Sequence, residues 1–432
     1  MKDKYVLLVI AVLGLCWYVT LSTAIATPIN YNKCISNAKK AMEKELYNDV
    51  ISEYESALTY KPNDLVAKKG LAKVYLVLDR KSDFVSESMS IISMTNGEAE
   101  DTIQMLEDYY IDKGKYEDAI DLALDFKAKY PDNKTVQKYY KQLRGQYDEM
   151  YCSYDHLGTI FNGYAVYQSG EEFGVVKSNG KTAFDKTGEY AGVFFDTNTV
   201  APMVSDGMAY YVDEDGIKAI VPDIKYDYLG VQTEDYVVAS KNGKYGYLSL
   251  KMDEVCEFVY DDATAFYNHV AAVKKGEKWA IINSDFEQIT DFIYDDVAMD
   301  ENRICSKKGV IWVCQKEKYM LIDKTGNPVT KADYDEVREF ISNEATAVKK
   351  NGKWGFVNYD GSVMIECIYE DAKPFREGMA PVCKDGKWGY IDTDNEFVIV
   401  PQFEDATPFY SDGRATVQIN GSWTIIQLYS YS

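Results

Sequence analysis

Histidine is nearly absent from this sequence, which contains only His156 and His269 among its 432 residues. A Ser/His/Asp or Cys/His catalytic arrangement would therefore depend on one of these two residues. His269 lies at a predicted junction between repeats, where a plain surface histidine is expected. No glycine-rich loop of the kind that binds phosphate groups is found either. We therefore expect a protein without catalytic activity. An enzyme of unknown type, with a histidine in a deep polar pocket, is the weaker alternative.

Paired cysteines and an excess of positive charge are also missing. None of the eight cysteines forms a Cys-x-x-Cys pair, so neither a zinc knuckle nor a thioredoxin-like motif is supported. Their scattered spacing is typical of buried apolar filling residues. The formal net charge of −22 repels phosphate backbones, which excludes nucleic acid as an expected partner.

Metal and cofactor motifs are not evident. The segments Asp213–Gly216 and Asp392–Asn395 resemble the start of a calcium-binding loop. The twelfth position counted from Asp392 is Phe403, however, where such a loop needs a bidentate glutamate. We predict hairpin turns at both segments, with no bound metal and no cofactor.

Only one long uncharged run is present, from Tyr5 to Ala26, and it follows Lys2 and Lys4. As a helix, its roughly 22 residues would measure about 33 Å, which is enough to span a bilayer. The charge bias predicts a cytoplasmic N-terminus and an extracytoplasmic bulk. Ala24-Ile25-Ala26 has the form of a cleavage site, so a cleaved signal peptide and a secreted protein are the alternative. We favour a retained membrane anchor in residues 1–26.

Residues 27–150 have the apolar spacing of helices. Breaks at Pro62, Asn96 and Pro131 lie 34 to 35 residues apart, which is the period of a helix-turn-helix repeat. This region resembles the tetratricopeptide repeat family at Ala57, Pro62, Ala72, Tyr75, Tyr110, Tyr116, Ala119 and Pro131. It departs from that family at Glu107, where a small residue is usual. The resemblance implies three units whose groove binds peptides or partner proteins, with a final helix at about 134–150. A simple helical stalk is the alternative.

From residue 151 to residue 432 the pattern changes to eight copies of a unit of roughly 35 residues. An aromatic residue marks seven of the eight copies, and glycine follows it in four of them. The marked positions are Phe173-Gly174, Met208-Ala209, Tyr245-Gly246, Trp279-Ala280, Tyr319-Met320, Trp354-Gly355, Trp388-Gly389 and Trp423-Thr424. Because Phe173, Tyr245 and Tyr319 replace tryptophan, the position is expected to serve packing and not chemistry.

Each unit is predicted to form three short strands, such as 345–350, 353–358 and 362–369, joined by turns at Asn351-Gly352 and Asp360-Gly361. Three short strands cannot bury their own apolar face, so the units must pack on one another. A closed propeller-like ring and an open β superhelix both fit the repeat. Closure is favoured because it removes exposed sheet edges.

The segments Gly352–Gly355 and Gly386–Gly389, both containing Lys-Trp-Gly, resemble the WG repeat family of bacterial proteins. The resemblance implies a β-repeat array, usually without catalytic activity, that binds partners at the bacterial surface or within complexes. The expected fold class is thus an α plus all-β multidomain protein. It comprises an N-terminal transmembrane helix, a tetratricopeptide-like α-solenoid and eight three-stranded β-meander repeats.

A pair of acidic residues ends most units and, in any regular array, would align along one edge. The pairs are Asp261 and Asp262, Asp295 and Asp296, Asp335 and Glu336, Glu370 and Asp371, and Glu404 and Asp405. They form either a solvated rim or an acidic binding rim for basic partners or divalent ions.

The sequence therefore predicts a membrane-anchored, extracytoplasmic scaffold of a bacterial cell membrane that binds protein partners. The alternative is a surface carbohydrate-binding module that stacks sugars on aromatic residues between units. Exposed Tyr and Trp in clefts would favour the carbohydrate module, whereas buried aromatics would favour the protein scaffold.

Overall fold

A computed structural model describes residues 27–431 of the chain. The helices up to Leu143 form one compact unit, and the residues from Arg144 onward form a second. The predicted membrane anchor, residues 5–26, lies outside the described residues. Among the residues that are described, no helix is long and apolar enough to cross a membrane.

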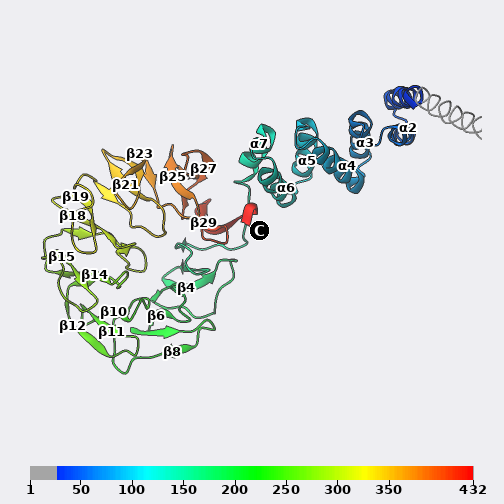
Figure 1. The fold of residues 1–432 in the computed structure, drawn as a ribbon. Coiled ribbons are helices and arrows are strands. Elements are labelled where there is room, and N and C mark those ends of the chain that lie inside the picture. The colour runs from blue at the N-terminus through cyan, green and yellow to red at the C-terminus, as the bar shows by residue number, and fades with distance from the viewer. Residues whose placement is uncertain (1–26, 432) are drawn as a thin grey trace, which may run out of the picture. The chain divides into compact units, whose positions relative to one another are not determined.

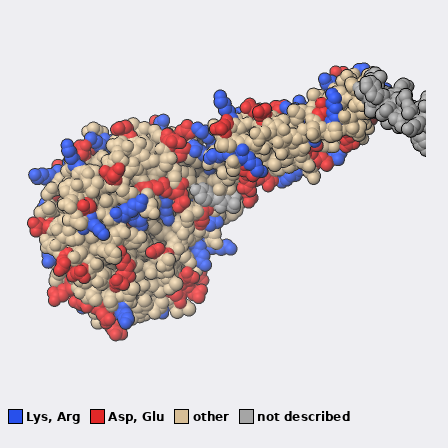
Figure 2. Space-filling view, in the orientation of Figure 1, with Lys and Arg blue, Asp and Glu red and all other residues tan. Residues whose placement is uncertain are grey.

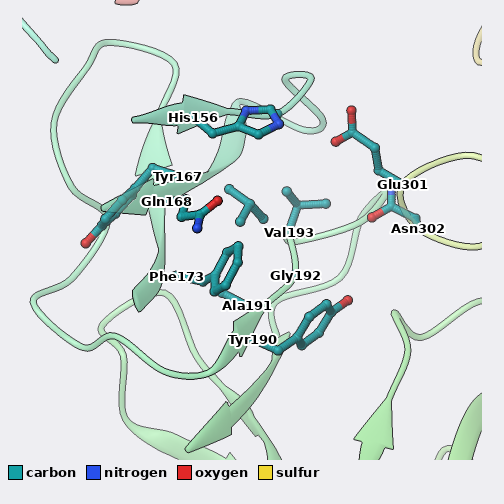
Figure 3. Close-up of a pocket in the computed structure, with 12 residues that line it drawn as sticks. His156, Tyr167, Gln168, Phe173, Tyr190, Ala191, Gly192, Val193, Glu301 and Asn302 are labelled. Atoms are coloured by element: carbon teal, nitrogen blue, oxygen red, sulfur yellow. The ribbon is translucent and has the colours of Figure 1, made fainter. Parts of the chain in front are cut away.

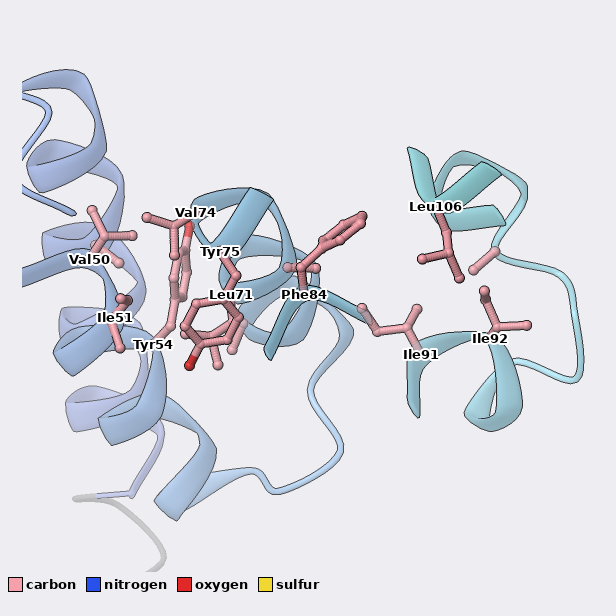
Figure 4. Packing of buried hydrophobic residues seen from close by; sticks show 14 of the residues in the cluster. Val50, Ile51, Tyr54, Leu71, Val74, Tyr75, Phe84, Ile91, Ile92 and Leu106 are labelled. Atoms are coloured by element: carbon pink, nitrogen blue, oxygen red, sulfur yellow. The ribbon is translucent and has the colours of Figure 1, made fainter. Parts of the chain in front are cut away.

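The first unit is helical. Residues 27–43 form a helix, followed by α2 (Tyr47–Tyr60), α3 (Leu65–Val77), α4 (Lys81–Met94), α5 (Glu100–Asp112), α6 (Tyr116–Lys129) and α7 (Lys134–Leu143). Asp64 caps α3 by accepting a hydrogen bond from the amide of Ala67, and Asn133 does the same for Val136 before α7. Apolar side chains from successive helices, such as Tyr54, Leu71 and Phe84, share one core (Figure 4).

The predicted final helix was wrong in its length, because α7 ends at Leu143 and not near Met150. Residues beyond it are held by the second unit. A Cβ on Gly145 would lie 2.0 Å from the carbonyl oxygen of Val398, and Arg144 forms an ion pair with Asp392 at 2.7 Å. The chain therefore enters the β region earlier than the apolar spacing indicated.

The second unit contains eight sheets, which follow one another around a ring as the blades of a propeller (Figure 1). Blades 1 to 4 are β2 (His156–Leu157), β3 (Tyr164–Ser169) and β4 (Glu172–Lys177); β5 (Tyr190–Ala191), β6 (Ala201–Ser205), β7 (Met208–Val212) and β8 (Lys218–Ile220); β9 (Tyr228–Leu229), β10 (Tyr236–Lys241), β11 (Lys244–Ser249) and β12 (Glu254–Tyr260); and β13 (Asp262–Ala263), β14 (Val270–Lys275) and β15 (Lys278–Asn283).

Blades 5 to 7 are β16 (Asp296–Val297), β17 (Ser306–Lys307), β18 (Val310–Gln315) and β19 (Lys318–Asp323); β20 (Glu336–Val337), β21 (Thr346–Lys350), β22 (Lys353–Val357) and β23 (Val363–Tyr369); and β24 (Asp371–Ala372), β25 (Met379–Lys384), β26 (Lys387–Asp392) and β27 (Phe397–Phe403). Blade 8 contains β28 (Asp405–Ala406), β29 (Arg414–Ile419) and β30 (Ser422–Leu428), and η1 (Tyr429–Tyr431) follows it.

Strand β1 (Tyr147–Glu149) closes the ring. It pairs with β30 and thereby supplies the outer strand of blade 8 from the start of the unit, with Asp148 opposite Gln427. This pairing rules out the open superhelix, because the start and the end of the unit share one sheet. Closure of a propeller in this way leaves no unpaired strand between its ends.

The predicted fold class was wrong in several respects. The described chain is mostly an eight-bladed propeller, with α-helices confined to residues 27–143, and it has no membrane-spanning helix within residues 27–431. Most blades also have four strands and not three. The strand that the prediction lacked is the innermost one, such as Glu336–Val337, which spans two residues and is too short to show an alternating pattern.

Candidate functional site

The signature aromatic residues pack between blades. Trp354 is 2% exposed and lies in one core with Ala372 and Phe375 of the next blade. Trp279, Trp388 and Trp423 are buried in equivalent cores at other blade junctions. Phe173, Tyr245 and Tyr319 occupy the same position but are only partly buried. The tryptophans at this position thus pack between blades, whereas the other aromatic residues are partly open to solvent.

The glycine after the aromatic residue makes room for a bulge in the outer strand of its own blade. Between the pairs Trp354–Tyr369 and Phe356–Ile365 the register of β23 shifts, and a Cβ on Gly355 would lie 2.5 Å from the carbonyl oxygen of Ile365. Gly389 and Gly246 meet β27 and β12 in the same way. Blade 4, which has alanine at this position, has only isolated bridges in place of the outer strand.

The first residue of each predicted acidic pair holds a hairpin turn of the following blade. The Asp261 carboxylate accepts from the amide of Gly276 at 2.7 Å, and Glu370 accepts from Gly386 at 2.9 Å. The same role falls to Asp295, Asp335 and Glu404, and also to Asp155, Glu189 and Asp227, which sequence reasoning missed. Ion pairs with Lys244, Lys278 and Lys318 lower the pKa values of Asp261, Asp295 and Asp335, and the Gly386 amide lowers that of Glu370.

The second residue of each pair begins an inner strand, and all five of these carboxylates have partners. Arg303 pairs with Asp262, Tyr319 donates to Asp296, Lys349 pairs with Glu336, Arg338 with Asp371, and Lys373 with Asp405. Arg338 and Lys373 also lie over the rings of Trp354 and Trp388. Figure 2 shows acidic and basic side chains interspersed on the visible face of the ring. Seven of the ten predicted carboxylates thus pair with a cationic side chain of the ring.

The inner-strand position changes character around the ring. In blades 4 to 8 it holds the five acids just described, whereas in blades 1 to 3 it holds His156, Tyr190 and Tyr228. The hydroxyls of Tyr190 and Tyr228 share a hydrogen bond, and burial raises the pKa values of both. One side of the ring interior is thus aromatic.

A loop of blade 5, residues 299–305, enters the interior of the ring, and we call it the channel loop. It accounts for the 40-residue step between Trp279 and Tyr319, which exceeds the usual 34 to 37. Ile304 forms a parallel bridge with Ala265. Glu301 accepts from the Thr159 hydroxyl of blade 1 at 2.8 Å. Since blades 1 and 5 are opposite in a ring of eight, this contact crosses the channel.

The channel also contains carboxyl groups with raised pKa values. Burial, together with the charge of Glu301, raises the pKa of Asp300 to about 7. Burial and the charge of Asp300 raise the pKa of Glu339 to about 8. The interior of the ring therefore disfavours additional negative charge.

A cavity of about 280 Å³ lies between blades 1 and 2 and the channel loop (Figure 3). Its lining residues are His156, Gly158, Val166, Tyr167, Gln168, Phe173, Tyr190, Ala191, Gly192, Val193, Glu301 and Asn302. His156 and Glu301 lie near one side, with Phe173 and Tyr190 opposite (Figure 3). A Cβ on Gly158 would lie 2.7 Å from the Glu301 carboxylate, so glycine is needed for the close approach of that side chain.

Two polar residues of this cavity differ in how they are satisfied. Glu301 is bonded to Thr159 through both the hydroxyl and the amide. Asn302 is only 5% exposed, and its Nδ2 has no hydrogen-bond partner. Sequence reasoning missed both residues, and the long step between repeats was the signal that could have found them.

The two histidines lie apart. His156 stacks on Trp423 with ring centroids 5.1 Å apart, whereas His269 is an exposed residue beside Glu234. Asp213 and Asp392 each accept from two amides within a turn, as predicted. Within residues 27–431, no group of three or more His, Cys, Asp or Glu side chains is placed to hold a metal ion.

Four segments of the ring match the family model of the WG containing repeat: residues 245–279, 319–354, 354–388 and 388–423. Each match runs from one signature aromatic residue to the next. Together these matched segments make up 140 of the 432 residues. This family match does not extend to the helical residues, so the tetratricopeptide interpretation gains no support from it. The chain also has no match among curated proteins.

Similar solved structures are distant. PorZ, a surface component of the type-IX secretion system of Porphyromonas gingivalis, is 8% identical with a TM-score of 0.37, and the match covers 63% of this chain and 42% of PorZ. The dihydro-heme d1 dehydrogenase NirN is 10% identical with a TM-score of 0.42, covering 71% and 84%. The Arabidopsis OM64 TPR domain is 14% identical with a TM-score of 0.22, covering 26% and 93%. This chain thus spans less than half of PorZ. The propeller with WG repeats is compatible with a non-catalytic binding or scaffold role.

Proposed function

We propose that the ring is a non-catalytic scaffold that binds a protein partner at the outer rim of blades 6 and 7. The observation that carries the proposal is that the residues shared by the repeats build the ring, whereas the exposed residues differ between blades. The signature tryptophans are buried between blades, and the paired acids hold hairpin turns or pair with neighbouring side chains of the ring. The exposed outer strands vary between blades, and binding specificity can reside there.

The outer strands of blades 6 and 7 expose apolar side chains to solvent. Val400 of β27 is 64% exposed and Ile368 of β23 is 54% exposed, and Val363 is similarly open. On the outer strand of blade 3, Val255 and Val259 are 41% and 43% exposed. Contiguous exposed apolar side chains are typical of protein interaction sites, and an outer strand also offers backbone groups that a partner can pair with.

The burial of the tryptophans also favours a protein scaffold over a lectin that stacks sugars on them. Trp279, Trp354, Trp388 and Trp423 are all buried between blades, where no sugar can reach their faces. The net charge of −22 further favours a partner with a basic surface.

The test is affinity capture with the full chain from an extract of the source cells. The variant Ile368→Glu/Val400→Glu introduces charge on the proposed rim, and Val255→Glu/Val259→Glu is the matched control on blade 3. We expect a discrete partner that wild type and control retain and that the rim variant loses. Equal capture by all three proteins would refute the assignment of this rim.

A further inference from the structure

The cavity between blades 1 and 2 has the composition of a small-ligand site. It lies entirely in the part of the ring outside the four segments that match WG repeats. We propose that this cavity binds an uncharged saccharide of one or two rings. The proposal concerns a site separate from the outer rim and does not depend on the protein partner.

Asn302 places an unpaired hydrogen-bond donor in the wall of this cavity. Its side chain lines the cavity, is 95% buried (5% exposed), and has an Nδ2 donor without a partner. Buried donors are rarely left unsatisfied in folded proteins, because desolvation without a hydrogen bond is unfavourable. A ligand oxygen beside Asn302 would remove this defect.

Glu301, in contrast, can bind a hydrogen-bond donor of the ligand. Its carboxylate can only accept hydrogen bonds, and the amide and hydroxyl of Thr159 use only part of its capacity. A hydroxyl group can donate to Glu301 and accept from Asn302, which few other ligand groups do. An anionic ligand is disfavoured, because Glu301, Asp300 and Glu339 are all close in the channel. A simple cation would leave Asn302 unsatisfied.

The remaining walls suit the faces of a sugar ring. Tyr167, Phe173 and Tyr190 present aromatic surface, and Gln168 and His156 supply further polar groups. Phe173 occupies the signature position that is buried as Trp354 in blade 6, but here it is only partly buried and borders the cavity. The volume of about 280 Å³ is at or just below the roughly 300–1,000 Å³ of sites for drug-sized ligands, which limits the occupant to one or two rings.

The test is ligand-observed NMR titration of the full chain with the methyl glycosides of glucose, galactose, mannose and N-acetylglucosamine. Acetate and tetramethylammonium serve as anionic and cationic probes. We expect saturable binding of at least one glycoside and of neither ion. Asn302→Leu and Glu301→Gln should each weaken that binding about tenfold or more, since each removes a hydrogen bond to the ligand.

Glu366→Gln, an exposed carboxylate on the outer strand of blade 6, is the matched control and should bind as wild type does. Phe173→Leu preserves apolar packing while removing the aromatic face, so it should also weaken glycoside binding. This variant tests the cavity even if either polar variant fails to fold. The proposal is overturned if no glycoside binds saturably, if an ion binds in place of the glycosides, or if the cavity variants bind as tightly as the control.

Discussion

Gly355→Ala tests the packing that builds each blade. The added Cβ would lie 2.5 Å from the carbonyl oxygen of Ile365 and 2.7 Å from the amide nitrogen of Cys367, whereas ordinary contact begins at 3.4 Å. Both neighbours are backbone atoms, so strand β23 must retreat by about 0.9 Å. Overpacking of this kind costs about 1–3 kcal/mol. Alanine also restricts the unfolded chain, which stabilises the folded protein by about 0.4–1 kcal/mol.

The two effects have opposite signs, and the clash is the larger. We therefore expect Gly355→Ala to lower the free energy of unfolding by about 1–2 kcal/mol, which is a fall of a few degrees in Tm for a domain of this size. Urea denaturation measures the free energy. Hydrogen exchange should show faster exchange in Val363–Tyr369, the outer strand of blade 6.

Ala280→Gly is the matched control, because Ala280 holds the same repeat position in blade 4, where the outer segment forms only isolated bridges. It should cost about 0.5–1 kcal/mol through added backbone freedom and leave exchange in blade 6 unchanged. If Gly355→Ala is as stable as wild type or more stable, the close approach of β23 does not explain the glycine.

Three further predictions concern charge and closure. Glu107 is buried, and burial raises its pKa to about 8, whereas its pKa in the unfolded chain is near 4.3. Glu107→Gln should therefore stabilise the protein by about 1–3 kcal/mol at pH 8, and by progressively less as pH falls to about 4. Thermal melts at several pH values measure this difference. Glu370→Gln removes a carboxylate with a lowered pKa. Wild type should therefore be more stable than the variant above about pH 4.3, and this difference in stability should be lost as pH falls through the lower pKa of the folded protein. An equal difference in stability at pH 3 and pH 7 would contradict this. Asp148→Pro breaks the pairing of β1 with Gln427 of β30. It should lower the free energy of unfolding by about 3 kcal/mol or more and speed amide hydrogen exchange in blade 8. A variant as stable as wild type would mean that β1 does not close the ring.

The repeat itself could be predicted from the sequence because its turn and strand residues have strong local conformational preferences. The positive-φ pair Asn351-Gly352 forms the expected hairpin. The substitution of Phe173 and Tyr245 for tryptophan indicated packing, and the tryptophans at this position are buried between blades. Glu107, where the tetratricopeptide resemblance fails, is indeed buried without a full set of partners.

Other features depend on contacts between distant residues and left no local pattern. Inner strands such as Glu336–Val337 are too short for alternation. Ring closure joins Tyr147 to Leu428 across the whole unit, and Glu301 finds Thr159 across the channel. The acidic pairs were recognised, but their partners at turns and on neighbouring blades became visible only in three dimensions.

Site-specific photo-crosslinking in intact source cells tests the central claim most directly. A photoreactive phenylalanine analogue is placed at Val400 on the proposed rim or at Val255 on blade 3, and adducts are identified by mass spectrometry. A protein scaffold that uses blades 6 and 7 predicts a discrete protein adduct from position 400 and none from position 255. The absence of an adduct at position 400, or the same adduct from both positions, would contradict it.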